Sequence, residues 1–186
     1  ELHDDLGQGL SVARLMTNKI SLSEDHDRLE IADEINLLLG ECSQDIRNLS
    51  KVFITKQVKQ FGFIESLERE IFRIKRLELM NVDYQNNNQD LKIASDHALI
   101  LFRIVQECIN NVIKHSRSKE MKLLVEDTPK IIKIMINDDG VGFNLETEND
   151  GSGLRSMASR AQLIGAKLSI SSVENQGTKV TITYQK

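Results

Sequence analysis

The spacing of apolar residues changes near residue 60, and this change limits the possible fold more than any other feature of the sequence. Before it, apolar residues recur every three or four positions, which predicts amphipathic helices. After it, helical spacing alternates with short aliphatic runs that are typical of strands. We therefore expect an α+β protein, with an all-helical segment over residues 1–60 and a mixed segment over residues 61–186.

The helical segment carries two apolar stripes, which predict an antiparallel hairpin. The first helix should end near Leu22, and a polar run over residues 23–27 separates it from a second helix that reaches Phe53. Two helices alone leave one side of their seam exposed, so we expect the hairpin to form a homodimeric four-helix bundle. The stripes consist of Leu2, Leu6, Leu10, Ala13, Met16 and Ile20, then Ile31, Ile35, Leu38, Cys42, Ile46, Leu49 and Phe53.

The mixed segment predicts an α/β sandwich, in which helices cover one face of a mostly antiparallel sheet. Helices are expected near residues 64–77, 98–112 and 154–164, and strands near 82–84, 121–125, 131–136, 168–171 and 180–184. The run Asn86–Asp90 should be a solvated loop, and Asp96 is a candidate N-cap for the middle helix.

Composition excludes several classes of protein. In 186 residues, 40% are hydrophobic and 28% are charged, which is ordinary for a globular chain. The net charge of −4 argues against non-specific binding to nucleic acid or to a membrane surface. The two cysteines do not have the spacing of a zinc site or a disulfide framework, so a cytoplasmic location is expected.

No apolar run approaches the roughly 20 residues that span a bilayer, and the first residues do not resemble a signal peptide. The second helix looks longer than the first, and the sequence opens almost directly on a motif. We therefore expect it to be part of a longer protein, which could itself be attached to the inner membrane.

One polar segment lies on the helix predicted near residues 98–112. Glu107, Asn111, Lys114 and His115 are spaced by three or four residues, so they share or border one helix face. An amide oxygen such as that of Asn111 suits Mg²⁺, and Lys114 offers a point charge to phosphate oxygens. A polar helix face in water explains this segment equally well.

Three further segments contain glycines. Asp138 precedes Gly140 and Gly142, so a carboxylate that could accept a hydrogen bond from an adenine amine is followed by backbone that could approach a ligand closely. Residues 151–154 precede a helix whose N–H groups could attract phosphate. Gly177-Thr178 places a hydroxyl between the last two strands. A tight turn, helix capping and a hairpin turn are the respective alternatives.

Together, the four segments resemble the N-box, G1 box, G2 box and terminal G-T element of the GHKL ATPases, which have the Bergerat ATP-binding fold. The resemblance covers residues 62–186 and implies ATP and Mg²⁺ as cofactors. It implies that Asn111 binds Mg²⁺ with Glu107 beside it, and that Asp138 reads adenine. Residues 144–152 resemble the ATP lid. The other residues that it places at the ATP site are Lys114, His115, Gly140, Gly142, Gly151, Gly153, Leu154 and Thr178.

The first ten residues indicate a branch of this superfamily. Leu2–Leu10 resembles the H-box of sensor histidine kinases of the NarX and DesK type, H-[DE]-x-x-G-Q. With the apolar stripe turned into the bundle, His3 should point outward. The resemblance implies that Asp4 acts as general base and that Gln8 orients a water for phosphatase chemistry. An ordinary solvated helix face is the alternative for Asp4 and Gln8.

The resemblance therefore implies a histidine kinase core that transfers a phosphoryl group from ATP to His3 and then to an aspartate of a response regulator. The alternative is a dimeric nucleotide-binding scaffold with phosphatase activity and little kinase activity. A clamp-closing ATPase is a third possibility, but it has no use for the H-box. His26 and His97 are expected to be capping or solvated residues, and Cys108 a buried one.

Overall fold

The computed structural model describes residues 2–20, 25–145 and 152–186 of the chain; within this range the side chains of residues 2–9, 25–27, 30, 47–51 and 152 are not described. The chain divides into two compact units, Glu1–Lys56 and Gln57–Lys186. This division lies close to the boundary predicted at residues 60 and 61. Helix α2 (Asp25–Arg76) contributes to both units. In the described residues, no helix is long and apolar enough to cross a membrane.

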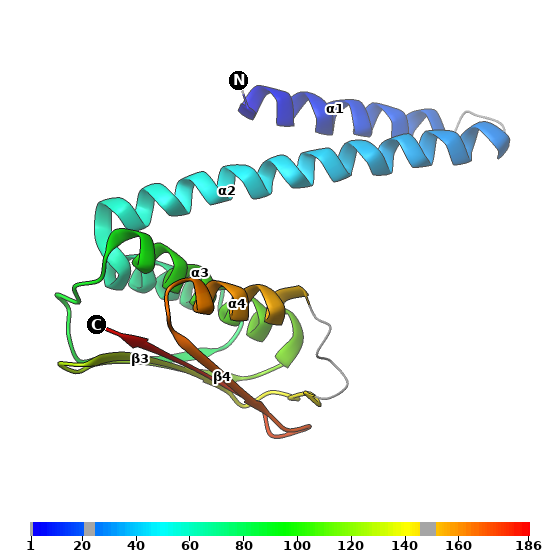
Figure 1. Ribbon diagram of the computed structural model, residues 1–186. Helices are drawn as coiled ribbons and strands as arrows, with labels where there is room; N and C mark the ends of the chain where they lie inside the picture. Colours follow the sequence, from blue (N-terminus) through cyan, green and yellow to red (C-terminus); the bar gives the residue numbers. More distant parts are fainter. Residues whose placement is uncertain (1, 21–24, 146–151) are drawn as a thin grey trace. The chain divides into compact units, whose positions relative to one another are not determined.

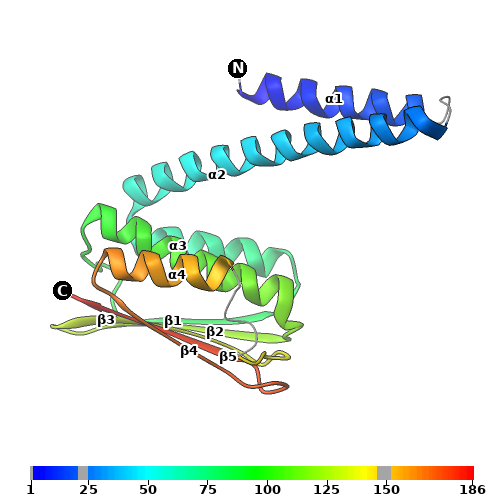
Figure 2. The same ribbon diagram turned by 45° about the vertical axis from the view of Figure 1, so that its right-hand side comes forward.

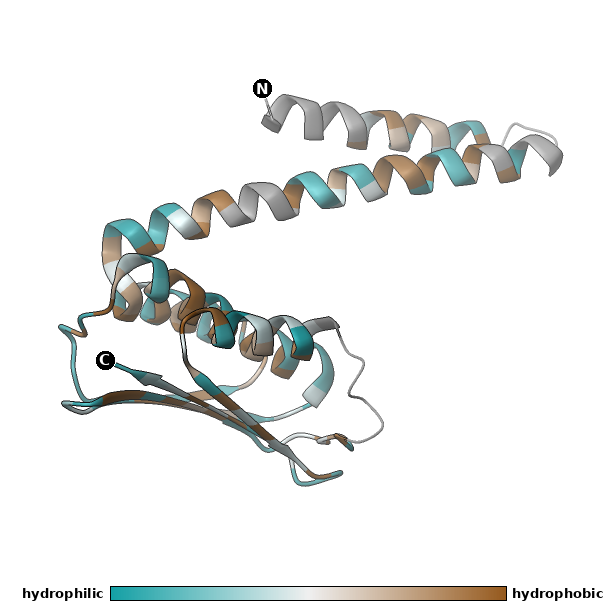
Figure 3. Cartoon of the chain, viewed as in Figure 1, coloured by the Kyte–Doolittle hydropathy of each residue, from teal (hydrophilic) through white to brown (hydrophobic). Residues whose placement is uncertain are grey.

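The first unit is a helical hairpin, as predicted. Helix α1 (Leu2–Ile20) lies alongside the beginning of α2 (Figure 1). Figure 3 shows hydrophobic and hydrophilic residues alternating along α2, as expected for a helix with one apolar face. Ala13, Ile31 and Ile35 form its buried core, with Met16, Ile20 and Leu38 packed against it.

Part of the predicted seam is not covered within this hairpin. Leu10, Ile46 and Phe53 retain exposed fractions of 48%, 54% and 68%. Leu15 and Leu37 are also exposed, although neither belongs to the predicted stripes. The hairpin therefore presents an apolar surface that its own described side chains leave in contact with solvent.

The second unit is the predicted α/β sandwich. Its five-stranded sheet has the order β1-β2-β3-β5-β4, in which only the β1–β2 pair is parallel. The helices cover one face of this sheet (Figures 1 and 2). The elements are β1 (Asn81–Asn86), α3 (Ser95–Asn111), β2 (Glu120–Asp127), β3 (Ile131–Asp138), α4 (Ser152–Leu163), β4 (Lys167–Ser172) and β5 (Thr178–Gln185).

Strand β3 shows how the sheet positions a polar residue inside the core. Ile132, Ile134 and Ile136 all face the helices and are at most 1% exposed. Side chains alternate between the two faces of a strand, so the next inward position is Asp138, which is 4% exposed. The same alternation that builds the core thus directs one carboxylate toward the helices.

The ends of α3 differ from the predicted ones. Ala94 occupies the N-cap position, so the prediction that Asp96 caps this helix is wrong; Asp96 lies in the first turn, and α3 has no side-chain cap within the described residues. At the other end, Val112–Ser116 form a π-helical turn, and Arg117 follows with φ 54°. The simple helical spacing of the sequence did not indicate this turn.

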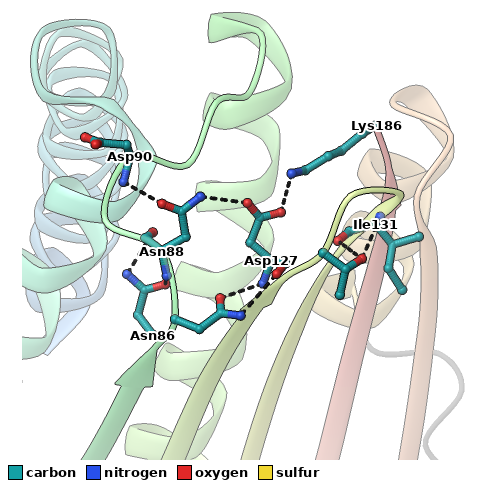
Figure 4. A network of polar contacts seen from close by, with 8 residues as sticks. Asn86, Asn88, Asp90, Asp127, Ile131 and Lys186 are labelled. Carbon is teal, nitrogen blue, oxygen red and sulfur yellow. Dashed lines mark hydrogen bonds and ion pairs between the residues drawn. The ribbon is translucent and has the colours of Figure 1, made fainter.

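The asparagine-rich run after β1 is anchored, whereas the sequence indicated a solvated loop. Asn88 Nδ2 donates to Asp127 Oδ2 at 2.8 Å, and Asn87 Oδ1 accepts the backbone N–H of Asp127 at 2.7 Å. Lys186 forms an ion pair with the same carboxylate (Figure 4). These bonds tie the loop to Asp127 at the end of β2, and Lys186, which follows β5, pairs with the same residue. The Lys186 ammonium lowers the pKa of Asp127; burial opposes this shift, and the Asn88 amide adds to it.

Helix α2 consists of two helical segments joined at Gly62. This residue has φ 78° and ψ −179°, a backbone conformation that is essentially restricted to glycine. The buried residues Phe63, Ile64 and Leu67 follow and anchor the second segment in the core of the second unit. Gly62 thus allows the chain to enter that core without a continuous α-helix.

Substitution of this glycine should destabilise the second unit. Gly62→Ala forces an L-residue into the φ 78° conformation and is expected to lower the free energy of unfolding by about 1–3 kcal/mol, measured by urea titration. Gly40→Ala is the matched control, because a Cβ there meets nothing within 4 Å, and it should raise stability by about 0.5–1 kcal/mol. Equal effects of the two substitutions would contradict this account.

Candidate functional site

A cavity of about 670 Å³ lies between the sheet and the helices α3 and α4 of the second unit. This volume is in the range of pockets that hold nucleotide-sized ligands. Its lining includes most of the site residues predicted from the second unit: Glu107, Asn111, Lys114, His115, Asp138, Gly142, Gly153, Leu154 and Thr178. Four segments that are far apart in the sequence therefore meet at one cavity.

The other predicted site residues lie elsewhere. Gly140 is adjacent to the cavity and donates its N–H to Asp138 Oδ1 at 2.9 Å. The backbones of His3, Asp4 and Gln8 belong to α1, but their side chains are outside the described residues. Gly151 and most of the segment compared with an ATP lid, residues 146–151, are also outside them.

One part of the cavity wall is apolar. Ile136, Ile170 and Val180 contribute from three strands, and Met157 contributes from α4. The thiol of Cys108 donates to Met157 Sδ at 3.3 Å, and burial raises the pKa of this thiol to about 12. Cys108 is therefore a buried, unreactive residue, as predicted. The four apolar side chains form a surface against which a flat apolar ring can pack.

Asp138 is the buried acceptor beside this apolar wall. Burial raises the pKa of its carboxyl group, the backbone N–H groups of Gly140 and Thr178 lower it, and the nearby Asp139 raises it. Thr178 is the register partner of Asp138 across β3 and β5. A carboxylate and a hydroxyl are thus held side by side at one edge of the cavity.

Asp139 has a different environment, although it is the next residue. Its Oδ1 accepts the backbone N–H groups of Lys119 and Glu120, each at 2.9 Å. The hydrogen bond from the backbone N–H of Glu120 lowers the pKa of Asp139. Desolvation opposes this shift, and the backbone N–H of Lys119 adds to it. Asp139 therefore holds the beginning of β2, and it does not line the cavity.

The opposite pKa shifts of these two carboxyl groups predict opposite effects on stability. The lowered pKa of Asp139 means that its contribution is present above the unfolded pKa of about 3.9 and is lost as pH falls through the folded value. The raised pKa of Asp138 means that its contribution is present at low pH and is lost as pH rises.

Thermal unfolding between about pH 3 and about pH 7 tests this contrast. Asp139→Asn should lower the unfolding temperature at neutral pH and have less effect in acid. Asp138→Asn should leave the unfolding temperature unchanged or raise it at neutral pH, because it removes the cost of burying a charge. A clear destabilisation by Asp138→Asn at neutral pH would show that its ionised form stabilises the fold.

The π-helical turn places Lys114 and His115 at the exposed end of the cavity, whereas Glu107 and Asn111 are half-buried on α3. Ser116 closes the turn. Its Oγ donates to the carbonyl of Val112 at 2.7 Å, and its own carbonyl accepts the N–H of Val141 at 2.8 Å. The turn is thereby attached to the loop that follows Asp138.

The beginning of α4 lies directly against this polar face. A Cβ built on Gly153 would stand 2.7 Å from Glu107 Oε1 and 3.8 Å from Asn111 Nδ2. A side chain at residue 153 would therefore press on the Glu107 carboxylate. Because Gly153 has no side chain, the space between the beginning of α4 and the side chains of Glu107 and Asn111 stays unoccupied.

The glycines of the loop after β3, and Gly177 of the β4–β5 turn, also allow close contacts within the protein. A Cβ on Gly140 would lie 2.3 Å from the carbonyl oxygen of Ser116. A Cβ on Gly142 would lie 2.0 Å from that of Val173, and one on Gly177 would lie 2.0 Å from that of Asp138. These three glycines let the loop pack against the π turn and the β4–β5 hairpin.

Replacing Gly177 should show this close approach directly. Gly177→Ala introduces both a strained φ of 81° and a collision with Asp138, and we expect a loss of about 2–4 kcal/mol in the free energy of unfolding. Gly165→Ala is the control, because φ is 65° but a Cβ meets nothing within 4 Å, and it should cost about 1 kcal/mol. Similar losses for both would mean that backbone strain alone matters.

Two contacts of the second unit, one beside the cavity and one away from it, have no recognisable signal in the sequence. Ser172 Oγ accepts the N–H of Phe143 at 2.9 Å and contacts Thr178 Oγ1 at 2.9 Å. His97 is half-buried and bonds through Nδ1 to the hydroxyl of Tyr184 at 2.7 Å, so the prediction of a capping or solvated role for His97 is wrong. Small hydroxyls and single histidines are too common in sequences to reveal such partners.

Comparison with known proteins points to one family. Residues 96–186 match the family model described as Histidine kinase-, DNA gyrase B-, and HSP90-like ATPase. The chain is 25% identical to the sensor histidine kinase LiaS of Bacillus subtilis (strain 168), with 98% of this chain aligned. The aligned part is 51% of that relative, so the chain spans about half the length of the curated protein that it matches.

Solved structures share the fold. The histidine kinase domain of the blue-light activated histidine kinase EL346 from Erythrobacter litoralis superposes with a TM-score of 0.65 at 17% identity, covering 94% of this chain and 95% of that one. The Acinetobacter baumannii histidine kinase AdeS gives 0.59 at 12% identity, covering 97% and 96%. At these identities, the likeness concerns the arrangement of the elements.

Proposed function

We propose that this chain transfers the γ-phosphoryl group of ATP to His3 and then to an aspartate of a response regulator. Its similarity to sensor histidine kinases and the match of residues 96–186 to the ATPase family model support this proposal. The convergence of four motif segments on one cavity is the observation that carries this proposal. A phosphorylated imidazole is a high-energy donor, so the second transfer runs downhill.

Adenine would bind at the apolar wall, with its amine donating to Asp138. The carboxylate is 4% exposed and lies beside Ile136 and Thr178, so it offers one oriented acceptor in an otherwise apolar region. Gly140 donates to Asp138 and holds that carboxylate, and Gly142 shapes the loop beside it. Such a site favours a base that carries an exocyclic amine.

The phosphates would lie toward the exposed end of the cavity. Lys114 and His115 stand there at the π turn, where they could contact phosphate oxygens. Leu154 lies in the first turn of α4, whose N-terminal N–H groups favour an anion. We assign Gly151 and Gly153 to the glycine-rich entrance of this helix.

Glu107 and Asn111 fit a Mg²⁺ ion that also binds substrate phosphates. Both line the cavity, and both offer hard oxygen ligands beside the space that Gly153 leaves open. Mg²⁺ is usually held by one or two protein ligands together with substrate phosphates and water, so these two side chains would need the nucleotide to complete the site. When bound, Mg²⁺ would neutralise phosphate charge.

His3 would act as the nucleophile on the γ-phosphorus. A neutral imidazole is required, and a histidine with an unperturbed pKa of about 6.5 is mostly neutral at pH 7. Asp4 would accept a hydrogen bond from the N–H of the other ring nitrogen, and it would stabilise the positive charge that develops on the imidazole as the N–P bond forms and ADP leaves. Gln8, one turn later, would orient a water that hydrolyses the phosphorylated aspartate of the regulator and releases inorganic phosphate, which is a separate phosphatase reaction.

The hairpin would associate with a second copy to form a four-helix bundle. The exposed apolar side chains on α1 and α2, among them Leu15, Leu37 and Phe53, support this assembly. Burying such a surface against an identical one removes it from water and completes the seam that one hairpin leaves open. The same helices would present His3 to the regulator.

Incubation with γ-labelled ATP and Mg²⁺ tests the proposed transfer. The native sequence should acquire label that is stable in base and labile in acid, as expected for a phosphorylated histidine. His3→Gln should abolish the label because it removes the acceptor. Asp138→Asn and Asn111→Asp should each reduce it by at least about 100-fold, since they disturb base recognition and metal binding.

The same experiment separates the alternatives. Nucleotide binding without any label in the native sequence would favour a dimeric scaffold with phosphatase activity. Label that survives His3→Gln would show that another residue is the acceptor. Circular dichroism of each variant provides the control for folding.

A further inference from the structure

The hydroxyl of Ser172 joins three segments around the cavity. Ser172 is the last residue of β4 and is half-buried. Its Oγ accepts the N–H of Phe143 at 2.9 Å, donates to the carbonyl of Gly177 at 3.2 Å and lies 2.9 Å from Thr178 Oγ1. Phe143 and Thr178 both line the cavity, whereas Ser172 does not.

The donor and acceptor count of a hydroxyl gives these contacts a direction. Serine has one O–H donor and two acceptor positions. The contact with Gly177 is made to its carbonyl oxygen, which can only accept, so the Ser172 hydroxyl donates its proton there. The N–H of Phe143 occupies one of the two acceptor positions of Ser172 Oγ. The remaining contact is satisfied when Thr178 donates its proton to Ser172. Because the Thr178 proton is then directed at Ser172, Thr178 Oγ1 can only accept a hydrogen bond from a bound ligand.

We propose that Ser172 is a positioning residue that fixes Phe143 and turns the Thr178 hydroxyl into an acceptor beside Asp138. This inference rests on the proposed binding of ATP. Thr178 and Asp138 are register partners, so two acceptors lie at one edge of the cavity. An exocyclic amine, with two N–H donors, suits such a pair, whereas the oxo group at the corresponding position of guanine would place an acceptor against it.

Ser172 should therefore affect the selectivity for the base as well as affinity. Without its hydroxyl, Thr178 can rotate and donate to an incoming oxo group, and the N–H of Phe143 loses its partner. We expect Ser172→Ala to weaken ATP binding about tenfold, which corresponds to the loss of one to two hydrogen bonds. GTP binding should weaken less, so that the preference for ATP over GTP becomes smaller.

The test measures equilibrium binding of ATP and of GTP, with Mg²⁺ present, to the native chain, Ser172→Ala, Ser172→Thr and Ser171→Ala. Ser172→Thr keeps the hydroxyl and should restore both affinity and selectivity. Ser171 is exposed on the opposite face of β4, so Ser171→Ala should match the native chain. Thermal unfolding without nucleotide shows whether each variant is folded.

The outcomes separate this inference from the proposed function. Failure of the native chain to bind ATP would overturn both. Native binding together with unchanged affinity and selectivity in Ser172→Ala would overturn the role of Ser172 alone. Equal weakening of ATP and GTP, accompanied by a lower unfolding temperature, would identify Ser172 as a structural residue and would also overturn its role in selectivity. Selective loss of ATP binding in a folded Ser172→Ala supports it.

Discussion

The site depends on the close approach of three backbone segments at glycines. The loop after β3 contacts the π turn through Gly140, the β4–β5 hairpin through Gly142, and is itself contacted by Gly177. At each of these points, the position of a Cβ is occupied by another part of the chain. Because the loop is held from both sides, Asp138 keeps a fixed direction although it is surrounded by apolar residues. The polar residues of α3 and the carboxylate on β3 can therefore act on one ligand.

Sequence periodicity predicted the architecture well, because burial depends mainly on which face of an element a residue occupies. The inward positions of β3 and the apolar stripe of α3 follow directly from spacings of two and of three to four residues. The predicted strand ended at residue 136, so the alternation of faces could not be extended to Asp138 and Asp139 from the sequence. The structure continues β3 to Asp138, which places Asp138 inward and Asp139 outside the cavity. The motif segments themselves were visible because each combines unusual residues in a short stretch.

The features that the sequence did not reveal depend on contacts between distant segments. The π turn, the bond between His97 and Tyr184, and the anchoring of the asparagine run each join groups that no local pattern connects. The sequence indicated the glycines as possible ligand contacts, but it did not show that Gly140, Gly142 and Gly177 also stand against backbone of other segments. Leu10 and Phe53 lie on the predicted apolar stripes and are exposed in the hairpin, as expected if two helices alone leave one side of their seam uncovered. The sequence did not show which stripe residues would lie on that side.

The π turn also fixes the length of the segment that carries Lys114 and His115. A π turn contains one residue more than the α-helical turn that it replaces. Deleting one residue from Val112–Ser116 would remove the residue that the π turn adds and would restore ordinary α-helical winding. The number of residues between Asn111 and Ser116, whose carbonyl accepts the N–H of Val141, would then be one too few for the present turn. Homologous chains that keep this geometry should therefore keep the number of residues in this turn constant.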